Sequence, residues 1–178
     1  MNYYVLQVKT GFESKYQRLV ADRLAEEESE LYWPRRTLKI RKKGKTKDVE
    51  TALFPGYLIL ASERISEELH WILRRTNGFF RFLPDNRRVE PLSGSDLELI
   101  RHFLSFGEVL EKSRVYFDEN KRIRVVHGAL KGLEGKIVKV DKRKQRAKVE
   151  LSLYEDSFLI DFGFELIEPA EEDENGKT

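Results

Sequence analysis

The stretch TALFPGYLIL, residues 51–60, places a sharp turn directly before an apolar run. Proline fixes φ and glycine tolerates positive φ, so Pro55 and Gly56 suit a turn that leads into a strand at Tyr57. About a dozen mostly charged residues precede this turn. The turn leaves Phe54 and Tyr57 as two large aromatic side chains near one edge of a sheet, where they either fill a core or form a docking surface.

The residues around this turn predict an α/β sandwich that spans residues 1–106. Apolar residues alternate with polar ones in the expected strands and recur at helical spacing in the expected helices. The expected strands are 3–8, 31–40, 57–61 and 79–83, and the expected helices are 12–28, a short helix capped by Ser66, and a helix from about 95 to 104. Residues 41–50 are expected to be the flexible tip of a hairpin.

The second half of the chain has a different pattern. Residues 107–120 lack a clear period and predict a linker that carries at most a short strand. Short alternating segments follow at 122–126, 136–140, 147–153, 158–160 and 165–167. They predict a small SH3-like β-barrel over residues 121–169, because closure removes exposed strand edges. An acidic tail is expected at 170–178, and the whole chain is expected to be α+β.

Composition bounds the function. The 178 residues contain no cysteine, which excludes disulfides and thiolate chemistry, and the first residues show no secretory or membrane-spanning segment. We therefore expect a cytoplasmic protein that does not meet membranes. The net charge is only +2, but the charges are segregated, with a basic segment at 35–47 and an acidic run at 171–174.

The residue patterns argue against an enzyme. His70, His102 and His127 lie far apart and lack metal-ligand spacing, and the glycine-rich stretch at 128–135 lacks the Gly-Lys-Ser/Thr ending of a phosphate loop. No G-x-S-x-G elbow is present. We expect no catalytic residue, no metal site and no cofactor.

Clustered cations beside aromatic residues favour nucleic-acid binding. The basic segment alone could be a solvated hairpin tip, but further Lys and Arg are expected near the same sheet and next to Trp71. The candidate nucleic-acid-binding residues are Lys9, Lys15, Arg18, Arg35, Arg36, Arg74 and Arg75.

Five ordered blocks give the chain a family resemblance. YYVLQVKTGFE, ALFPGYLIL, WILRRTNGFFRFL and PLSGSDLELI resemble, in order and spacing, the amino-terminal domain (NGN) of NusG-family transcription elongation factors. RIRVVHGALKGLEGKIVKVDKRKQRAKVEL is similar to the KOW motif of the same family's carboxy-terminal barrel.

This resemblance implies a non-enzymatic, monomeric factor that binds the clamp helices of RNA polymerase and promotes elongation or antitermination. The family's docking patch corresponds to Phe54, Pro55, Gly56 and Tyr57, with Tyr4 and Trp71 as neighbours. Its barrel loop corresponds to Leu130 and Leu133, which in the family contact a small-subunit ribosomal protein or Rho.

Some residues depart from the housekeeping pattern of the family. Asn120-Lys121 stands where Gly-Asp is usual, and Glu155-Asp156 stands where Gly-Arg is common. These departures resemble specialised paralogues of the LoaP-like group, which recognise an RNA hairpin or non-template DNA on selected operons. A housekeeping NusG remains open, and so does a KOW-containing RNA-binding or ribosome-associated protein that does not act on polymerase.

Overall fold

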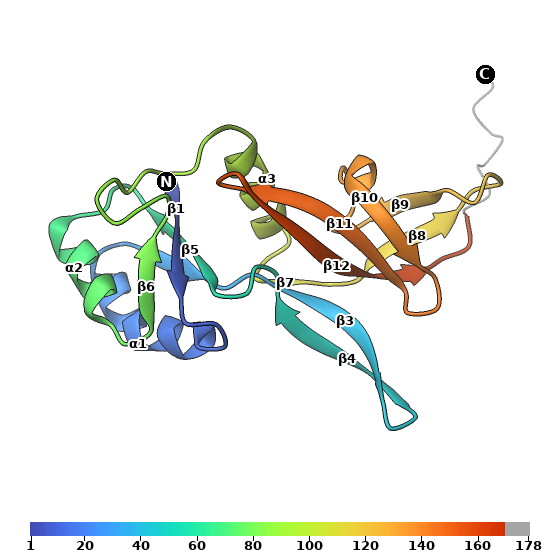
Figure 1. Cartoon of the computed structure of the whole chain (residues 1–178), viewed down its shortest axis with the longest axis horizontal. Coiled ribbons are helices and arrows are strands. Elements are labelled where there is room, and N and C mark those ends of the chain that lie inside the picture. The colour runs from blue at the N-terminus through green and yellow to red at the C-terminus, as the bar shows by residue number, and fades with distance from the viewer. Residues whose placement is uncertain (170–178) are drawn as a thin grey trace, which may run out of the picture.

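The computed structural model describes residues 1–169 and has a mixed α+β fold, as the sequence predicted. An N-terminal α/β part lies beside a β-rich C-terminal part, and a long hairpin projects from the junction between them (Figure 1). The acidic tail predicted at 170–178 falls outside the described residues. Within residues 1–169, no helix has the length and apolar content needed to cross a membrane.

The N-terminal part is built on a four-stranded sheet. The strand order is β2 (Glu30–Tyr32), β5 (Tyr57–Ser62), β1 (Asn2–Val8) and β6 (Phe79–Phe82), and every neighbouring pair is antiparallel. Helices α1 (Glu13–Glu26) and α2 (Glu67–Arg75) pack on one face of it. These elements lie close to their predicted positions, because each has a clear apolar period.

Both faces of this sheet are covered. Tyr4, Leu6 and Val8 point to the core beneath α1 and α2, whereas Val5 and Ile59 point to a second core. This alternation follows from the period of two along a strand. The second core also contains residues of α3 (Gly94–Leu104) and of the C-terminal sheet, so one hydrophobic core joins the two halves of the chain.

The junction hairpin forms a separate three-stranded sheet in the order β4 (Lys45–Ala52), β3 (Arg35–Lys42) and β7 (Val109–Leu110). Its two-residue turn has positive φ at both Lys43 and Gly44, the geometry that matches the twist of paired strands. The prediction of a flexible tip at 41–50 was wrong, because all of these residues except 43 and 44 belong to the paired strands β3 and β4. The predicted strand 31–40 is broken at Trp33-Pro34, where proline removes a backbone donor.

The C-terminal sheet consists of strands β8 to β12 in the order β10-β11-β12-β8-β9. Their bounds are β8 Ser113–Phe117, β9 Ile123–His127, β10 Ile137–Asp141, β11 Arg146–Leu153 and β12 Asp156–Leu166, with a short 3₁₀ helix at Glu134–Lys136.

Two predictions about this half need correction. Residues 107–120 are not a free linker, because they contain β7 and β8, and Val115 on β8 is fully buried. The segment 158–160 and residues 165–166 of the segment 165–167 belong to the single strand β12. Gly163, which lies between these segments, marks a close approach to another strand.

Candidate functional site

The Phe54-Pro55-Gly56-Tyr57 turn is rigid. The Tyr57 amide donates to the Phe54 carbonyl (3.0 Å), and Gly56 has a φ of 83°, which defines a type II turn. The Gly56 amide also donates to Oε1 of Glu13 (2.7 Å), a carboxylate buried at the start of α1. A Cβ at position 56 would lie 2.9 Å from Oγ1 of Thr10, so glycine is required here.

The aromatic residues of this turn face the C-terminal sheet. The Phe54 ring lies 5.3 Å from that of Phe158 and 6.3 Å from that of Phe103, and the Tyr57 ring lies 5.7 Å from Phe158. Phe54 is only 2% exposed. The expected exposed docking surface is therefore absent from this arrangement, because Phe158 of β12, about a hundred residues further along the chain, covers it. Pro55 remains exposed.

Tyr4 and Trp71 lie elsewhere. Tyr4 points to the α1 and α2 face of the four-stranded sheet, whereas Tyr57 packs against the core on the other face. Tyr4 lines a cavity together with Trp71. The single patch predicted from the resemblance is thus divided between two faces of one sheet.

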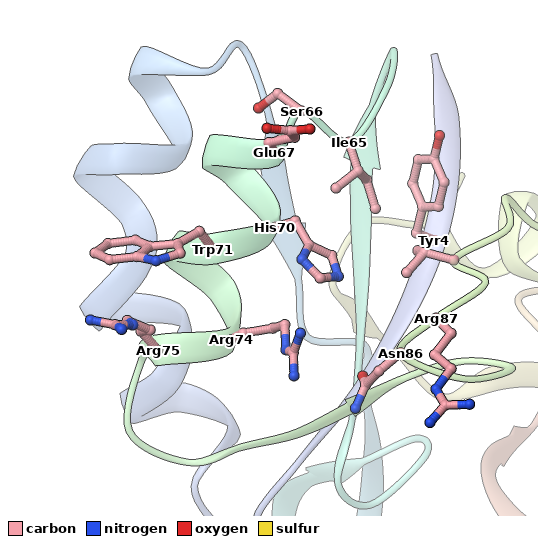
Figure 2. Close-up of a pocket in the computed structure, with 11 residues that line it drawn as sticks. Tyr4, Ile65, Ser66, Glu67, His70, Trp71, Arg74, Arg75, Asn86 and Arg87 are labelled. Carbon is pink, nitrogen blue, oxygen red and sulfur yellow. The ribbon is translucent and has the colours of Figure 1, made fainter.

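This cavity, which we name the α2 cavity, has a volume of about 760 Å³ and lies between α2, the end of β1 and the loop after β6 (Figure 2). It combines aromatic, aliphatic and cationic side chains. Its lining residues are Tyr4, Ile65, Ser66, Glu67, His70, Trp71, Arg74, Arg75, Asn86, Arg87 and Val89.

Helix α2 positions most of the polar groups of the cavity. Ser66 Oγ accepts a hydrogen bond from the Leu69 amide (3.0 Å) and fixes the start of the helix. Figure 2 shows Arg75 beside Trp71 on one side of α2, with the Arg75 guanidinium 4.5 Å from the ring centre. Trp71 is 52% exposed, so this aromatic and cationic pair is open to solvent.

His70 lies deeper in the α2 cavity. Its ring stacks on Phe82 at 5.1 Å, and burial together with the charge of Arg74 lowers its pKa below the ordinary value, although a hydrogen bond that His70 donates to the Asn86 backbone acts in the opposite direction. His70 therefore favours the neutral imidazole. The positive charge of the cavity comes from its arginines.

The predicted nucleic-acid-binding residues do not form one group. Arg74 and Arg75 line the α2 cavity, whereas Lys9, Lys15 and Arg18 are exposed outside its lining.

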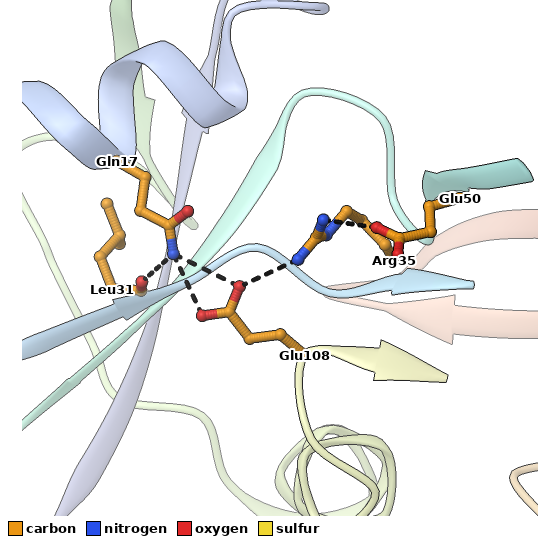
Figure 3. Close-up of polar contacts among 5 residues, drawn as sticks. All are labelled: Gln17, Leu31, Arg35, Glu50 and Glu108. Carbon is orange, nitrogen blue, oxygen red and sulfur yellow. Dashed lines mark hydrogen bonds and ion pairs between the residues drawn. The ribbon is translucent and has the colours of Figure 1, made fainter. Parts of the chain in front are cut away.

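Arg35 and Arg36 have structural roles. Nη1 of Arg35 pairs with Glu50 (2.6 Å), and Nη2 lies 3.8 Å from Glu108, which also accepts from Nε2 of Gln17 (Figure 3). Arg36 donates to the carbonyls of Ala52 and Asp161, and burial lowers its pKa. Their assignment to nucleic acid is corrected, because these donors bond to β4 within the junction hairpin and join the hairpin to Glu108 and Asp161.

The predicted barrel contacts are also buried. Leu130 is 0% exposed and Leu133 is 7% exposed, and both pack in the core that joins the two halves. Nε2 of His102 lies 2.8 Å from the Ala129 carbonyl, which fixes this loop against α3. These leucines therefore do not form a partner surface in this arrangement. In the described part of the chain, no three His, Asp or Glu side chains cluster closely enough to hold a metal ion.

Sequence reasoning missed several lining residues of the α2 cavity. Asn86, Arg87 and Val89 come from an irregular loop, and only the Arg87-Arg88 pair beside a strand could have suggested a cationic site. Ser66 was predicted only as the cap of a short helix, and Ile65 was not predicted to have a role.

Comparison with known proteins places these features in a family. Residues 1–101 match the family model described as "Transcription termination factor nusG". The chain belongs to the NusG family. It resembles NusG of Streptococcus pyogenes serotype M3, a transcription termination/antitermination protein, with 24% identity over 84% of this chain and 86% of the relative. NusG of Neisseria meningitidis serogroup B is 24% identical over 93% of this chain and 96% of its own length.

A solved structure, "Domain interaction in Thermotoga maritima NusG", is similar over 91% of this chain and 93% of that chain, with 15% identity and a TM-score of 0.49. As a member of the NusG family, this chain is a non-enzymatic transcription factor. The expectation that the protein is not an enzyme is confirmed by this membership.

Proposed function

We propose that this NusG-family protein binds RNA polymerase and nucleic acid and promotes elongation or antitermination on selected operons. The observation that carries the proposal is the α2 cavity, which presents an exposed tryptophan, a tyrosine and three arginines on one surface. The family relatives named as termination/antitermination proteins support the general role.

The α2 cavity has the chemistry of a single-stranded nucleic-acid site. A base can stack on the exposed face of Trp71, because every base has an aromatic face, and Arg75 already lies against this ring. Arg74 and Arg87 supply donors for phosphate oxygens in the same cavity. This arrangement suits an unpaired nucleotide of an RNA hairpin loop or of a displaced DNA strand.

Polymerase binding uses the turn at Phe54 and Tyr57 after the C-terminal sheet moves away from it. The support is the position of Phe158, which touches both aromatic rings yet remains partly exposed. An apolar patch of this kind, rimmed by charge, has the composition of an interface anchor. The C-terminal sheet is then free to meet a further partner, either a small-subunit ribosomal protein or Rho.

In vitro transcription through a terminator tests the nucleic-acid part of the proposal. The wild-type protein is expected to raise read-through on its own operon, and Trp71→Ala is expected to weaken single-stranded binding by about 1–3 kcal/mol and to lower read-through. Phe80→Ala is the control, since Phe80 is 67% exposed on β6 and does not line the cavity.

Equal loss in both variants, or wild-type binding by a folded Trp71→Ala protein, would rule out the α2 cavity as the nucleotide site. Read-through on every template alike would show a general factor rather than one for selected operons.

A further inference from the structure

A second basic surface lies where the junction hairpin meets the turn between β10 and β11. We name it the hairpin groove. It is a cavity of about 570 Å³ that shares no lining residue with the α2 cavity. Its lining residues are Lys39, Ile40, Arg41, Thr46, Arg143, Lys144 and Arg146. A smaller adjacent cavity shares Lys144 and Arg146 and adds Lys139, Asp141, Lys148 and Asp161.

The two cavities together carry seven Lys or Arg side chains and two carboxylates. Both carboxylates are engaged: Asp161 lies 3.7 Å from Arg146 and 3.8 Å from Lys148, and Asp141 accepts from the Lys144 amide at 2.9 Å. Among the described residues, no carboxylate lies within ion-pair distance of five of these cations. They are Lys39, Arg41, Lys139, Arg143 and Lys144.

Contacts between the two halves hold these cations in place. Nη2 of Arg146 donates to the Lys39 carbonyl (3.1 Å), and Nζ of Lys39 donates to Oε1 of Gln145 (3.2 Å). One wall of the groove belongs to β3 and β4, and the other belongs to β11 and to the turn that precedes it. The complete groove therefore exists only while the two halves are packed together.

The side chains of the groove select the chemistry of its ligand. Among the described residues that line it, none is aromatic, so it offers no platform for a base, in contrast to Trp71 in the α2 cavity. Arg and Lys donors at several separate points match the repeated negative charge of a nucleic-acid backbone. We propose that the hairpin groove binds the phosphate backbone of a nucleic acid without reading its sequence.

Backbone binding at this place has a consequence for the fold. A ligand that contacts both walls binds the packed arrangement more tightly than the separated one, and it shifts the equilibrium toward packing by that difference. The same packing covers Phe54. Nucleic acid in the hairpin groove therefore holds the aromatic turn covered.

The experiment compares two charge-reversal variants of the full chain. Arg143→Glu with Lys144→Glu alters the groove. The turn that carries these residues is held by a hydrogen bond from the Lys144 backbone amide to Asp141, which does not use either side chain. Lys121→Glu with Arg122→Glu is the matched control, since it makes the same change of charge at exposed residues in the turn between β8 and β9. Circular dichroism checks the fold of each variant.

Fluorescence anisotropy measures binding of a short duplex DNA and a short single-stranded RNA of arbitrary sequence between about 50 and 200 mM salt. The groove variant is expected to bind at least about tenfold more weakly than the control on one or both probes. Its log-log salt slope should be smaller by about two, one unit for each lost phosphate contact. The probe that loses more affinity identifies the preferred backbone.

Equal affinities and equal slopes for the groove and control variants on both probes would overturn this proposal. Adding Trp71→Ala to each variant separates the two sites, because the difference between groove and control should persist without the tryptophan. The comparison therefore still tests the hairpin groove if the α2 cavity proves not to bind a nucleotide.

Discussion

His70 lies where the α2 cavity meets the apolar core, so its titration reports on both. Burial against Phe82 and the nearby charge of Arg74 lower its pKa from the ordinary value of 6.5. Because the folded state binds the proton less readily than the unfolded state, this histidine contributes stability that is fully present above about pH 6.5. That contribution is lost as the pH falls through the lowered pKa.

We predict that Arg74→Ala raises the pKa of His70, because it removes a positive charge that opposes the imidazolium form. Histidine chemical shifts followed against pH by NMR give the value, with the exposed His127 of β9 as a reference in the same sample. A bound nucleotide phosphate in the α2 cavity should raise the same pKa. A His70 pKa that is unchanged by both the substitution and the nucleotide would contradict the described position of these groups.

The arginines show why single-residue roles were only partly predictable. Arg35 and Arg74 look alike in the sequence, since both stand beside another arginine and close to a tryptophan. Arg35 is neutralised by Glu50 and Glu108, and Glu108 lies 73 residues further along the chain. A partner so far away in the chain leaves no pattern in the sequence near the arginine. The sequence therefore could not distinguish arginines that line a cavity from arginines that are paired within the fold.

At the scale of elements, β12 depends on Gly163. A Cβ at this position would lie 2.5 Å from the Thr37 carbonyl of β3, which is closer than real side chains come. The glycine is needed for the approach of two strands and not for an unusual backbone angle. It allows β12 to contact the junction hairpin directly.

We predict that Gly163→Ala lowers the free energy of unfolding by about 1–3 kcal/mol, as overpacking in a tight contact usually does. Gly135→Ala is the matched control, because a Cβ there meets nothing within 4 Å and the backbone has no positive φ. Urea titrations compare the two. Hydrogen exchange should show weakened protection in β3 and β12, and an unfolding midpoint for Gly163→Ala equal to that of Gly135→Ala would refute the close contact.

Elements with a clear period were predictable, and elements defined by long-range pairing were not. The alternation in β1, the apolar run of β5 and the apolar stripe of α1 come from local sequence alone. Strand β4 is mostly polar and is exposed along most of its length, so only its pairing with β3 identifies it. The segment that contains β8 was predicted as a linker with at most a short strand. Its parallel partner β12 is about fifty residues further along the chain, so the pairing leaves no local pattern.

At the scale of the whole molecule, the packing of the two halves and the exposure of the aromatic turn exclude one another. Phe54 and Tyr57 make ring contacts with Phe158, and the same core extends through α3 and the C-terminal sheet. If only the separated arrangement binds polymerase, the measured affinity is reduced by the fraction of molecules that are separated. The strength of the packing then sets the affinity for polymerase.

Phe158→Ala is expected to strengthen polymerase binding, although it removes a hydrophobic side chain. It deletes two aromatic pairs, each contributing about 0.5–1.5 kcal/mol to the packing, which corresponds to an affinity gain on the order of five- to a hundredfold. Leu159→Ala is the matched control, because Leu159 is the next residue of β12 and is 62% exposed. Titration of immobilised RNA polymerase with each variant measures the change, and amide spectra should show the separated halves in Phe158→Ala alone. If the Phe158→Ala halves separate and affinity does not rise above that of Leu159→Ala, the covered turn is not the polymerase-binding surface. If they stay packed, the ring contacts at Phe158 do not control the arrangement, which leaves the contacts of the junction hairpin with Asp161 and Gly163 of β12 to hold it.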